Sequence, residues 1–128
     1  MASPLKLDGK VAFITGSTKG IGWATAQAMA QHGVSVVLNG HSDAALLDSR
    51  VAEIKDRFGV PAIGLCFHAA EPAAIKDAYK SIFQAHKRLD ILVNNAGILR
   101  TGVIGMLGDE MIRETLNLNT IAVIHHVQ

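Results

Sequence analysis

Eight residues near the start of the chain constrain its fold more than any other stretch. They read Thr-Gly-Ser-Thr-Lys-Gly-Ile-Gly (15–22) and separate an apolar run at 11–14 from an alanine-rich segment at 23–30. A strand, a glycine turn and a helix in this order form the layout in which N–H groups at the helix N-terminus bind a dinucleotide pyrophosphate. We therefore predict that the turn contacts a cofactor through Gly16, Ser17, Thr18, Lys19, Gly20, Ile21 and Gly22.

A second motif, Asn94-Asn95-Ala96-Gly97, follows another apolar run at 91–93. The glycines of the first motif are spaced Gly-x-x-x-Gly-x-Gly, unlike the Gly-x-Gly-x-x-Gly of many dinucleotide-binding proteins. Together the two motifs resemble the Thr-Gly-x-x-x-Gly-Ile-Gly and Asn-Asn-Ala-Gly signatures of the short-chain dehydrogenase/reductase family. The alternative, two unrelated glycine turns in another α/β protein, requires both motifs to occur in this order by coincidence.

The resemblance implies an oxidoreductase that transfers hydride between NADP(H) and a carbonyl or alcohol substrate, in the manner of 3-oxoacyl reductases, and that works as a homo-oligomer. It covers about the first half of a typical member. The family's catalytic Ser and Tyr-x-x-x-Lys pair have no match here, because the single tyrosine, Tyr79, has Phe83 at the fourth following place. We therefore interpret the 128 residues as an amino-terminal part that is inactive alone. Two other hypotheses are a nucleotide-binding module without chemistry and a fragment that seeks a partner.

Composition narrows the classes of protein that this chain can represent. With 128 residues it is expected to form one domain, residues 1–128, that binds NAD(P). A formal net charge of +1 favours neither nucleic acid nor an acidic membrane surface as a partner. A single cysteine, Cys66, and the lack of a signal peptide or an apolar run of about twenty residues favour a cytoplasmic location. Cys66 itself is expected to be a buried strand residue.

Hydrophobic patterns alternate between strands and helices along the chain. Strands are expected at 10–15, 34–38, 61–67 and 90–93, and helices after Gly20, from about 43 to 58, from about 71 to 87 and from 109 onward. This alternation predicts a doubly wound, Rossmann-like parallel sheet with strand order 3-2-1-4. The first helix is expected to face the sheet with Ile21, Ala24 and Ala28, and the third strand to be buried on both faces.

The end of the second strand bears on which cofactor is bound. Enzymes that use NAD commonly have an acidic residue there, which binds the ribose 2′-OH. This chain instead reads Asn39-Gly40-His41 at that place, and Lys19 lies inside the glycine loop. We predict that Lys19 and His41 meet a 2′-phosphate, so that NADP is preferred to NAD. Two alternatives remain open: Lys19 is an ordinary solvated charge, or Asp43 binds the ribose.

Other candidate residues lie at the carboxyl ends of the remaining strands. By the resemblance, Ala69 belongs beside the adenine, in His68-Ala69 where the family has Asp-Val, and Asn95, Ala96 and Gly97 belong beside the nicotinamide ribose. Asn119 resembles the helix asparagine whose backbone carbonyl holds a water in the family's proton relay, and it is the one catalytic candidate. No metal site is expected, since the neighbours His125 and His126 point to different sides of a helix.

Overall fold

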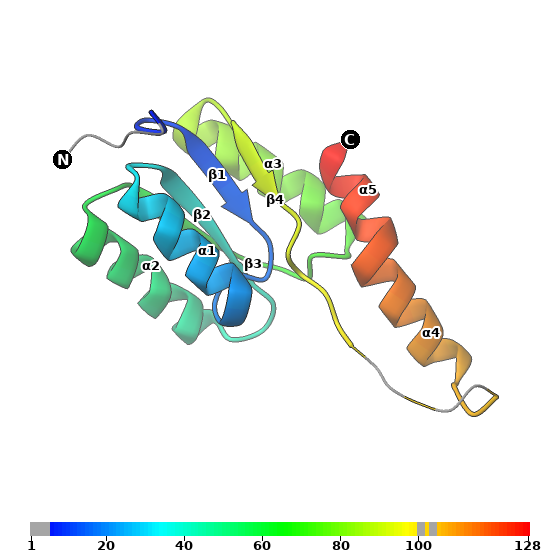
Figure 1. The fold of residues 1–128 in the computed structure, drawn as a ribbon. Coiled ribbons are helices and arrows are strands. Elements are labelled where there is room, and N and C mark those ends of the chain that lie inside the picture. Colours follow the sequence, from blue (N-terminus) through cyan, green and yellow to red (C-terminus); the bar gives the residue numbers. More distant parts are fainter. Residues whose placement is uncertain (1–5, 100–101, 103–104) are drawn as a thin grey trace.

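The sheet has the predicted strand order. The structure is a computed structural model that describes residues 6–99, 102 and 105–128. Its four strands are all parallel and lie in the order β3-β2-β1-β4 (Figure 1). Their bounds are β1 Val11–Ile14, β2 Ser35–Gly40, β3 Ala62–Cys66 and β4 Ile91–Val93. The doubly wound α/β architecture inferred from the sequence is therefore confirmed.

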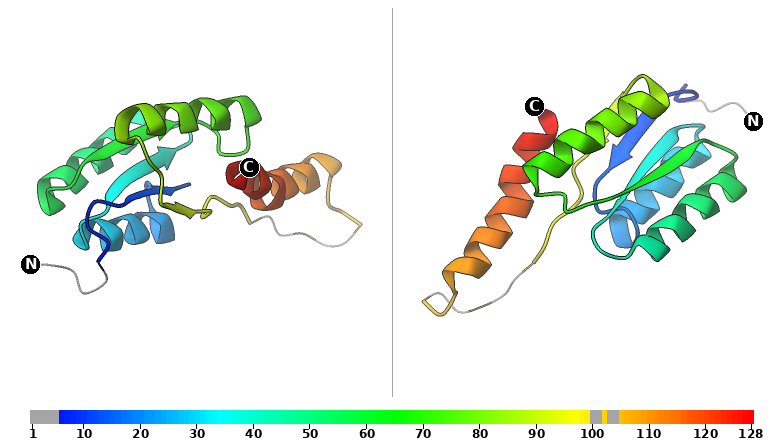
Figure 2. Two further views of the ribbon diagram at one scale, coloured as in Figure 1. Left: turned by 90° about the horizontal axis from the view of Figure 1, so that it is seen from above. Right: turned by 180° about the vertical axis from the view of Figure 1, so that it is seen from behind.

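Helices cover both faces of this sheet. On one face lie α1 (Gly20–Gln31) and α2 (Ala44–Phe58), and on the other lies α3 (Pro72–His86), as the front and rear views show (Figures 1 and 2). A last helical segment, which packs beside α3, consists of α4 (Asp109–Leu116), a π-helical turn η1 (Asn117–Ile121) and α5 (Ala122–Val127). None of the described helices is long and apolar enough to cross a membrane.

Helix α1 packs with a different face from the one expected. Its buried residues are Gly22, Ala26 and Ala30, while Ile21 is 79% exposed. Alanines occur on several faces of this helix, so apolar spacing alone does not define its phase. The phase follows instead from Gly22, whose bare backbone lies against the glycine loop. The prediction that Ile21, Ala24 and Ala28 face the sheet is wrong.

Strand β3 also differs from the expectation. It is an edge strand, and along it only Ala62 is fully buried, while Cys66 is exposed. A strand at the edge has one neighbour and incomplete helix cover, so its residues are not enclosed as those of β1 and β2 are. The predictions of a strand buried on both faces and of a buried cysteine are therefore corrected.

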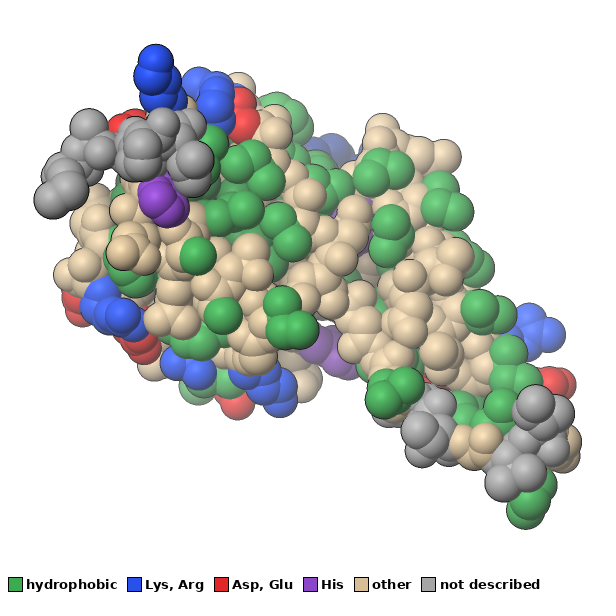
Figure 3. Space-filling model, viewed as in Figure 1, with side chains coloured by type: hydrophobic (Ala, Val, Ile, Leu, Met, Phe, Trp, Pro, Cys, Tyr) green, Lys and Arg blue, Asp and Glu red, His purple; other side chains and the backbone are tan. Residues whose placement is uncertain are grey.

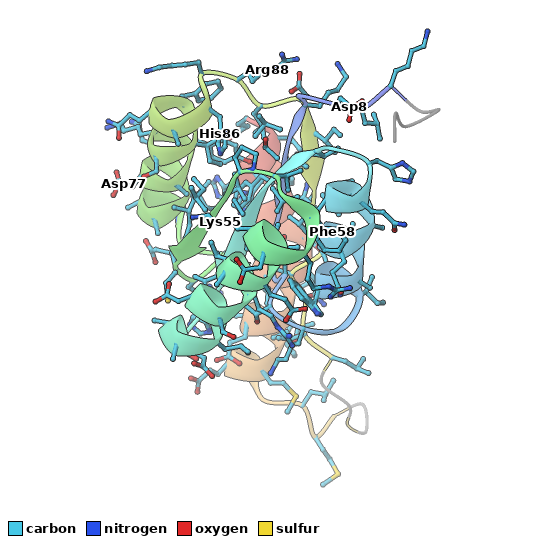
Figure 4. The ribbon with its side chains drawn as sticks, turned by 90° about the vertical axis from the view of Figure 1, so that its left-hand side faces the viewer. Asp8, Lys55, Phe58, Asp77, His86 and Arg88 are labelled. Carbon is cyan, nitrogen blue, oxygen red and sulfur yellow. The ribbon has the colours of Figure 1, made fainter. Side chains whose placement is uncertain are left out.

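The termini of α2 follow from local chemistry that is visible in the sequence. Asp43 is the N-cap residue, and its Oδ1 accepts a hydrogen bond from the Leu46 N–H at 2.9 Å. Gly59 ends the helix in the left-handed conformation, with φ of 66°. An ion pair lies at the edge of the sheet where β1 and β4 begin. Figure 4 shows Arg88 there, and its guanidinium binds the Asp90 carboxylate, which also accepts from the Val11 N–H.

A buried histidine attaches α5 to the rest of the fold. His126 is 5% exposed and packs against Phe13, Phe67 and Tyr79, with ring centroids 5.8 to 6.4 Å away. Its Nε2–H donates to the Ala69 carbonyl at 2.9 Å, and the Tyr79 hydroxyl donates to the His126 carbonyl at 2.8 Å. Burial lowers the pKa of His126 from its ordinary value of 6.5 and raises the pKa of Tyr79 to about 12.

The lowered pKa predicts a component of stability that is lost in mild acid. As the pH falls below about 6.5, His126 takes up a proton more readily in the unfolded chain than in the folded one. The free energy of unfolding should therefore decrease between that pH and the lowered pKa, by at most about 1.4 kcal/mol per pH unit for one proton. Denaturant titrations from pH 7.5 to 5 should show a steeper loss for the wild type than for His126→Gln. Parallel curves would contradict this assignment.

Candidate functional site

A cavity of about 520 Å³ opens at the carboxyl edge of the sheet. It lies between the glycine loop, the end of β2, the turn after β3 and the segment after β4. Most of the cofactor residues predicted from the sequence line it, namely Gly16, Thr18, Lys19, Asn39, Gly40, His41, Ala69, Asn95, Ala96 and Gly97. Four others among the described residues, Ser17, Gly20, Ile21 and Gly22, lie beside it at the start of α1 or beneath the loop, without lining it.

The two sequence motifs are joined directly by hydrogen bonds. The Thr15 Oγ1 accepts from the backbone N–H groups of Asn95, at 3.0 Å, and Ala96, at 2.9 Å. In return the Asn95 side-chain amide donates to the carbonyls of Thr15, at 3.1 Å, and Gly16, at 2.9 Å. This set of four bonds, the Thr15–Asn95 clasp, holds the loops after β1 and β4 together. The sequence prediction left out the contribution of Thr15, although this residue opens the glycine motif.

Asn39 attaches the same loop to the neighbouring strands. It is 2% exposed; its Oδ1 accepts from the Gly16 N–H at 2.9 Å, and its Nδ2 donates to the carbonyls of Leu65 and Phe67 at 3.2 and 3.1 Å. Because the protein occupies both ends of this amide, Asn39 shapes the cavity wall and has little left to offer a ligand through its side chain. A carboxylate here could not donate to the two carbonyls.

Close backbone contacts explain why position 22 is a glycine. A Cβ on Gly22 would lie 2.5 Å from the Asn95 Nδ2 and 2.9 Å from the Ser17 Cα, and would also strike the Gly16 carbonyl oxygen. Gly16 is constrained too, since its φ is +59° and a Cβ there would lie 3.0 Å from the Ala96 Cα. The close approach of α1 to the clasp therefore depends on the missing side chain at position 22.

Cationic and titratable side chains gather where β2 ends. Lys19 and His41 both line the cavity and are exposed. Asp43 lines it as well, but its carboxylate already caps α2. His68, which sequence analysis did not include among the site residues, lies edge to face with His41 at a centroid distance of 4.4 Å, and its Nδ1 accepts from the Ala70 N–H. The arrangement presents Lys19 and two imidazoles to an anion.

Arg50 on α2 was also missed, and it supports the loop from outside. Its Nε donates to the Thr18 carbonyl at 2.8 Å, and its guanidinium lies 4.4 Å from the centre of the Trp23 ring. No periodicity or motif in the sequence distinguishes this arginine from the other charged residues of α2, because the contact depends on how α2 packs beside α1.

Asn119 lies in the π-helical turn η1, beside the far wall of the cavity. Its Oδ1 accepts from the Ile98 N–H and its Nδ2 donates to the Ile98 carbonyl, both at 2.8 Å. Ile98 lines the cavity, whereas Asn119 does not. The side chain therefore holds the segment after β4, and π-helical turns of this kind are frequent at functional sites. Among the described residues, no three His, Cys, Asp or Glu side chains are grouped so as to hold a metal ion.

The close contact at Gly22 leads to a sharp prediction. Gly22→Ala should displace α1 or break the Asn95 bonds, lower the free energy of unfolding by about 1–3 kcal/mol and weaken binding of a dinucleotide. Thermal unfolding and calorimetric titration measure the two effects. Gln31→Ala is the control, because this exposed side chain lies at the other end of the same helix. Equal behaviour of the two variants would remove Gly22 from the contact.

Comparison with known proteins agrees with this geometry. The family model described as short chain dehydrogenase matches residues 10–128. A 3-oxoacyl-(acyl-carrier-protein) reductase of Aquifex aeolicus is 40% identical over 96 residues, covering 75% of this chain and 38% of the relative. A 2-dehydro-3-deoxy-D-gluconate 5-dehydrogenase of Formosa agariphila is 38% identical over 92 residues, covering 72% of this chain and 34% of the relative.

Solved structures show the same likeness. A short chain dehydrogenase from Burkholderia cenocepacia in complex with NADP has a TM-score of 0.90 and 39% identity, over 96% of this chain and 50% of that one. The L-sorbose reductase of Gluconobacter frateurii, complexed with NADPH and L-sorbose, has a TM-score of 0.91 and 31% identity, over 94% of this chain and 46% of that one. The chain thus spans half the length of these proteins or less. It belongs to the short-chain dehydrogenase family.

Proposed function

We propose that residues 1–128 form the NADP(H)-binding part of an oxidoreductase that reduces a carbonyl or oxidises an alcohol. The observation that carries this proposal is the cavity at the carboxyl edge, which is walled by both family motifs and bordered by Lys19 and His41. Ligands of open α/β sheets bind at this edge. Structural neighbours solved with NADP or NADPH support the choice of cofactor.

The residues suggest how each part of the cofactor is held. The backbone N–H groups at the start of α1 suit the pyrophosphate, through the loop from Gly16 to Gly22. Ala69 suits the adenine end, and the small Ala96 and Gly97 leave room for the nicotinamide ribose. Lys19 supplies positive charge to a 2′-phosphate, and the ring of His41 lies on the same side of the cavity. The bound cofactor supplies or accepts the hydride, and the chain's own residues bind and orient it.

We do not assign the proton transfer of the reaction to the cofactor-binding residues named above. The hydroxyl of Tyr79 donates to the His126 carbonyl in the core, and burial raises its pKa to about 12, so it is unsuited to donate a proton to a substrate. Asn119 is proposed to take part through its backbone, while its side chain bonds both backbone groups of Ile98. The proposed substrate class is a carbonyl or alcohol compound, such as a 3-oxoacyl compound, and the names of the relatives support it.

The last helical segment supports a proposal of self-association. Its exposed apolar side chains include Ile112, Leu116, Ile124 and Val127, and Figure 3 shows apolar groups along this segment. Several exposed apolar side chains along one helical segment are typical of protein interfaces. We expect sedimentation of the full-length protein to give a dimer or tetramer. A monomer at micromolar concentration would contradict this expectation.

Lys19 provides the test of cofactor choice. In the full-length protein, Lys19→Ala should weaken NADPH binding about fivefold, corresponding to roughly 1 kcal/mol for an exposed contact, and leave NADH binding nearly unchanged. Titration of cofactor fluorescence measures both affinities, and carbonyl-dependent oxidation of NADPH tests the activity. Lys76→Ala, on the exposed surface of α3, is the matched control. Equal losses for both cofactors would show that Lys19 does not bind the 2′-phosphate, and full-length protein without turnover on any carbonyl would refute the proposed reaction.

A further inference from the structure

Both sides of the cavity are attached to one helical segment. Asn119 in η1 bonds both backbone groups of Ile98, and His126 in α5 bonds the backbone of Ala69. Ile98 and Ala69 line the cavity, although they come from different loops, after β4 and β3 respectively. Leu118 of the same helical segment lines the cavity directly. The segment therefore spans the site, with one polar side chain attached at each end.

The hydrogen bond between His126 and Ala69 has a defined direction. A carbonyl oxygen only accepts, so the ring nitrogen at 2.9 Å from the Ala69 oxygen, Nε2, carries the proton. The other nitrogen, Nδ1, faces the Tyr79 hydroxyl at 3.2 Å. Phe13 and Phe67 pack against the ring. His126 is thus held by its neighbours in an orientation that presents a donor to Ala69.

The turn that receives this bond has few other long-range attachments. Residues 68–70 belong to neither a strand nor a helix, and the bond from Ala70 to His68 is local to the turn. Phe67, just before it, is held by Asn39 and Gly40. Within the described part of the chain, the hydrogen bond from His126 is the long-range one that reaches Ala69 itself. Without it the buried Ala69 carbonyl would be left unsatisfied, and among the described contacts the turn would keep only the ring contact of His68 with His41 as a long-range tie.

We propose that His126 is a positioning residue of the nucleotide site: through the Ala69 carbonyl it fixes the wall against which the adenosine half of the cofactor binds. The inference rests on the proposed function, because that function assigns Ala69 to the adenine. It goes beyond that function because it gives a role to a residue of α5, which packs beside α3 and lies outside both sequence motifs. The nicotinamide end, held by Asn119 and Ile98, should be unaffected by His126.

The test compares donors at position 126 in the full-length protein. His126→Leu and His126→Phe keep an apolar filling without a donor, while His126→Gln places an amide N–H near the position of Nε2. The probe is adenosine 2′,5′-bisphosphate, titrated by calorimetry. Its Kd should rise about tenfold in the first two variants and return to within about twofold of the wild type in His126→Gln. The KM for NADPH should follow the same pattern while kcat stays nearly constant.

A control variant on the same helix separates positioning from general stability. His125→Leu alters the neighbouring histidine, which has no bond to the turn among the described contacts, and should bind the bisphosphate normally. Thermal midpoints of all variants show which ones are folded at the temperature of the titration.

The outcomes are distinguishable. Equal affinity of wild type and folded His126→Phe would overturn the positioning role, and so would failure of a folded His126→Gln to restore binding. A matching loss in His125→Leu would also overturn it, since the loss would then follow any change in α5 and not the donor to Ala69. If the wild type itself did not bind the bisphosphate, the proposed function would fail, and with it the premise of this inference.

Discussion

The site depends on satisfying backbone polar groups at the carboxyl edge of a parallel sheet. Where β1 and β4 end, their loops turn away from the ladder and leave N–H and C=O groups near the interior. The Thr15–Asn95 clasp pairs four of these groups with two side chains that are 80 residues apart in the sequence. The bare backbone of Gly22 packs against the Asn95 amide of this clasp, and the two loops that the clasp joins both line the cavity.

Asn39 links the choice of cofactor to the stability of the fold. An acid at the end of the second strand would bind the ribose of NAD, and its absence was the basis for predicting NADP. The structure adds that the Asn39 amide donates to two carbonyls of the β3 segment and accepts from the Gly16 N–H. An amide satisfies all three groups, whereas a carboxylate satisfies one. The residue that stands where an acid would end β2 is thus also the one that joins the loop, β2 and β3.

The last helical segment connects the site to the surface of the molecule. Asn119 and the buried His126 bond to the two sides of the cavity, while Ile124 and Val127 are exposed to solvent. The π-helical turn between α4 and α5 is where the side chain of Asn119 reaches Ile98. The last helical segment therefore bonds to two sides of the cavity and also presents the surface proposed to contact a second subunit. Subunit association and cofactor binding would thus both depend on this segment.

The sequence by itself determined the strand order, the extent of α2 and most of the residues that line the cavity. These features follow from local chemistry or from motifs whose spacing dictates their place: an aspartate before a helix, a glycine after it, glycines between a strand and a helix. Tertiary structure alone decided which face of α1 is buried, that β3 is a partly exposed edge, and that His126, one of two adjacent histidines, lies in the core beside Ala69. Periodicity cannot settle these points, because alanines lie on several faces of α1 and because burial and hydrogen bonding at β3 and His126 are set by neighbours distant in the sequence.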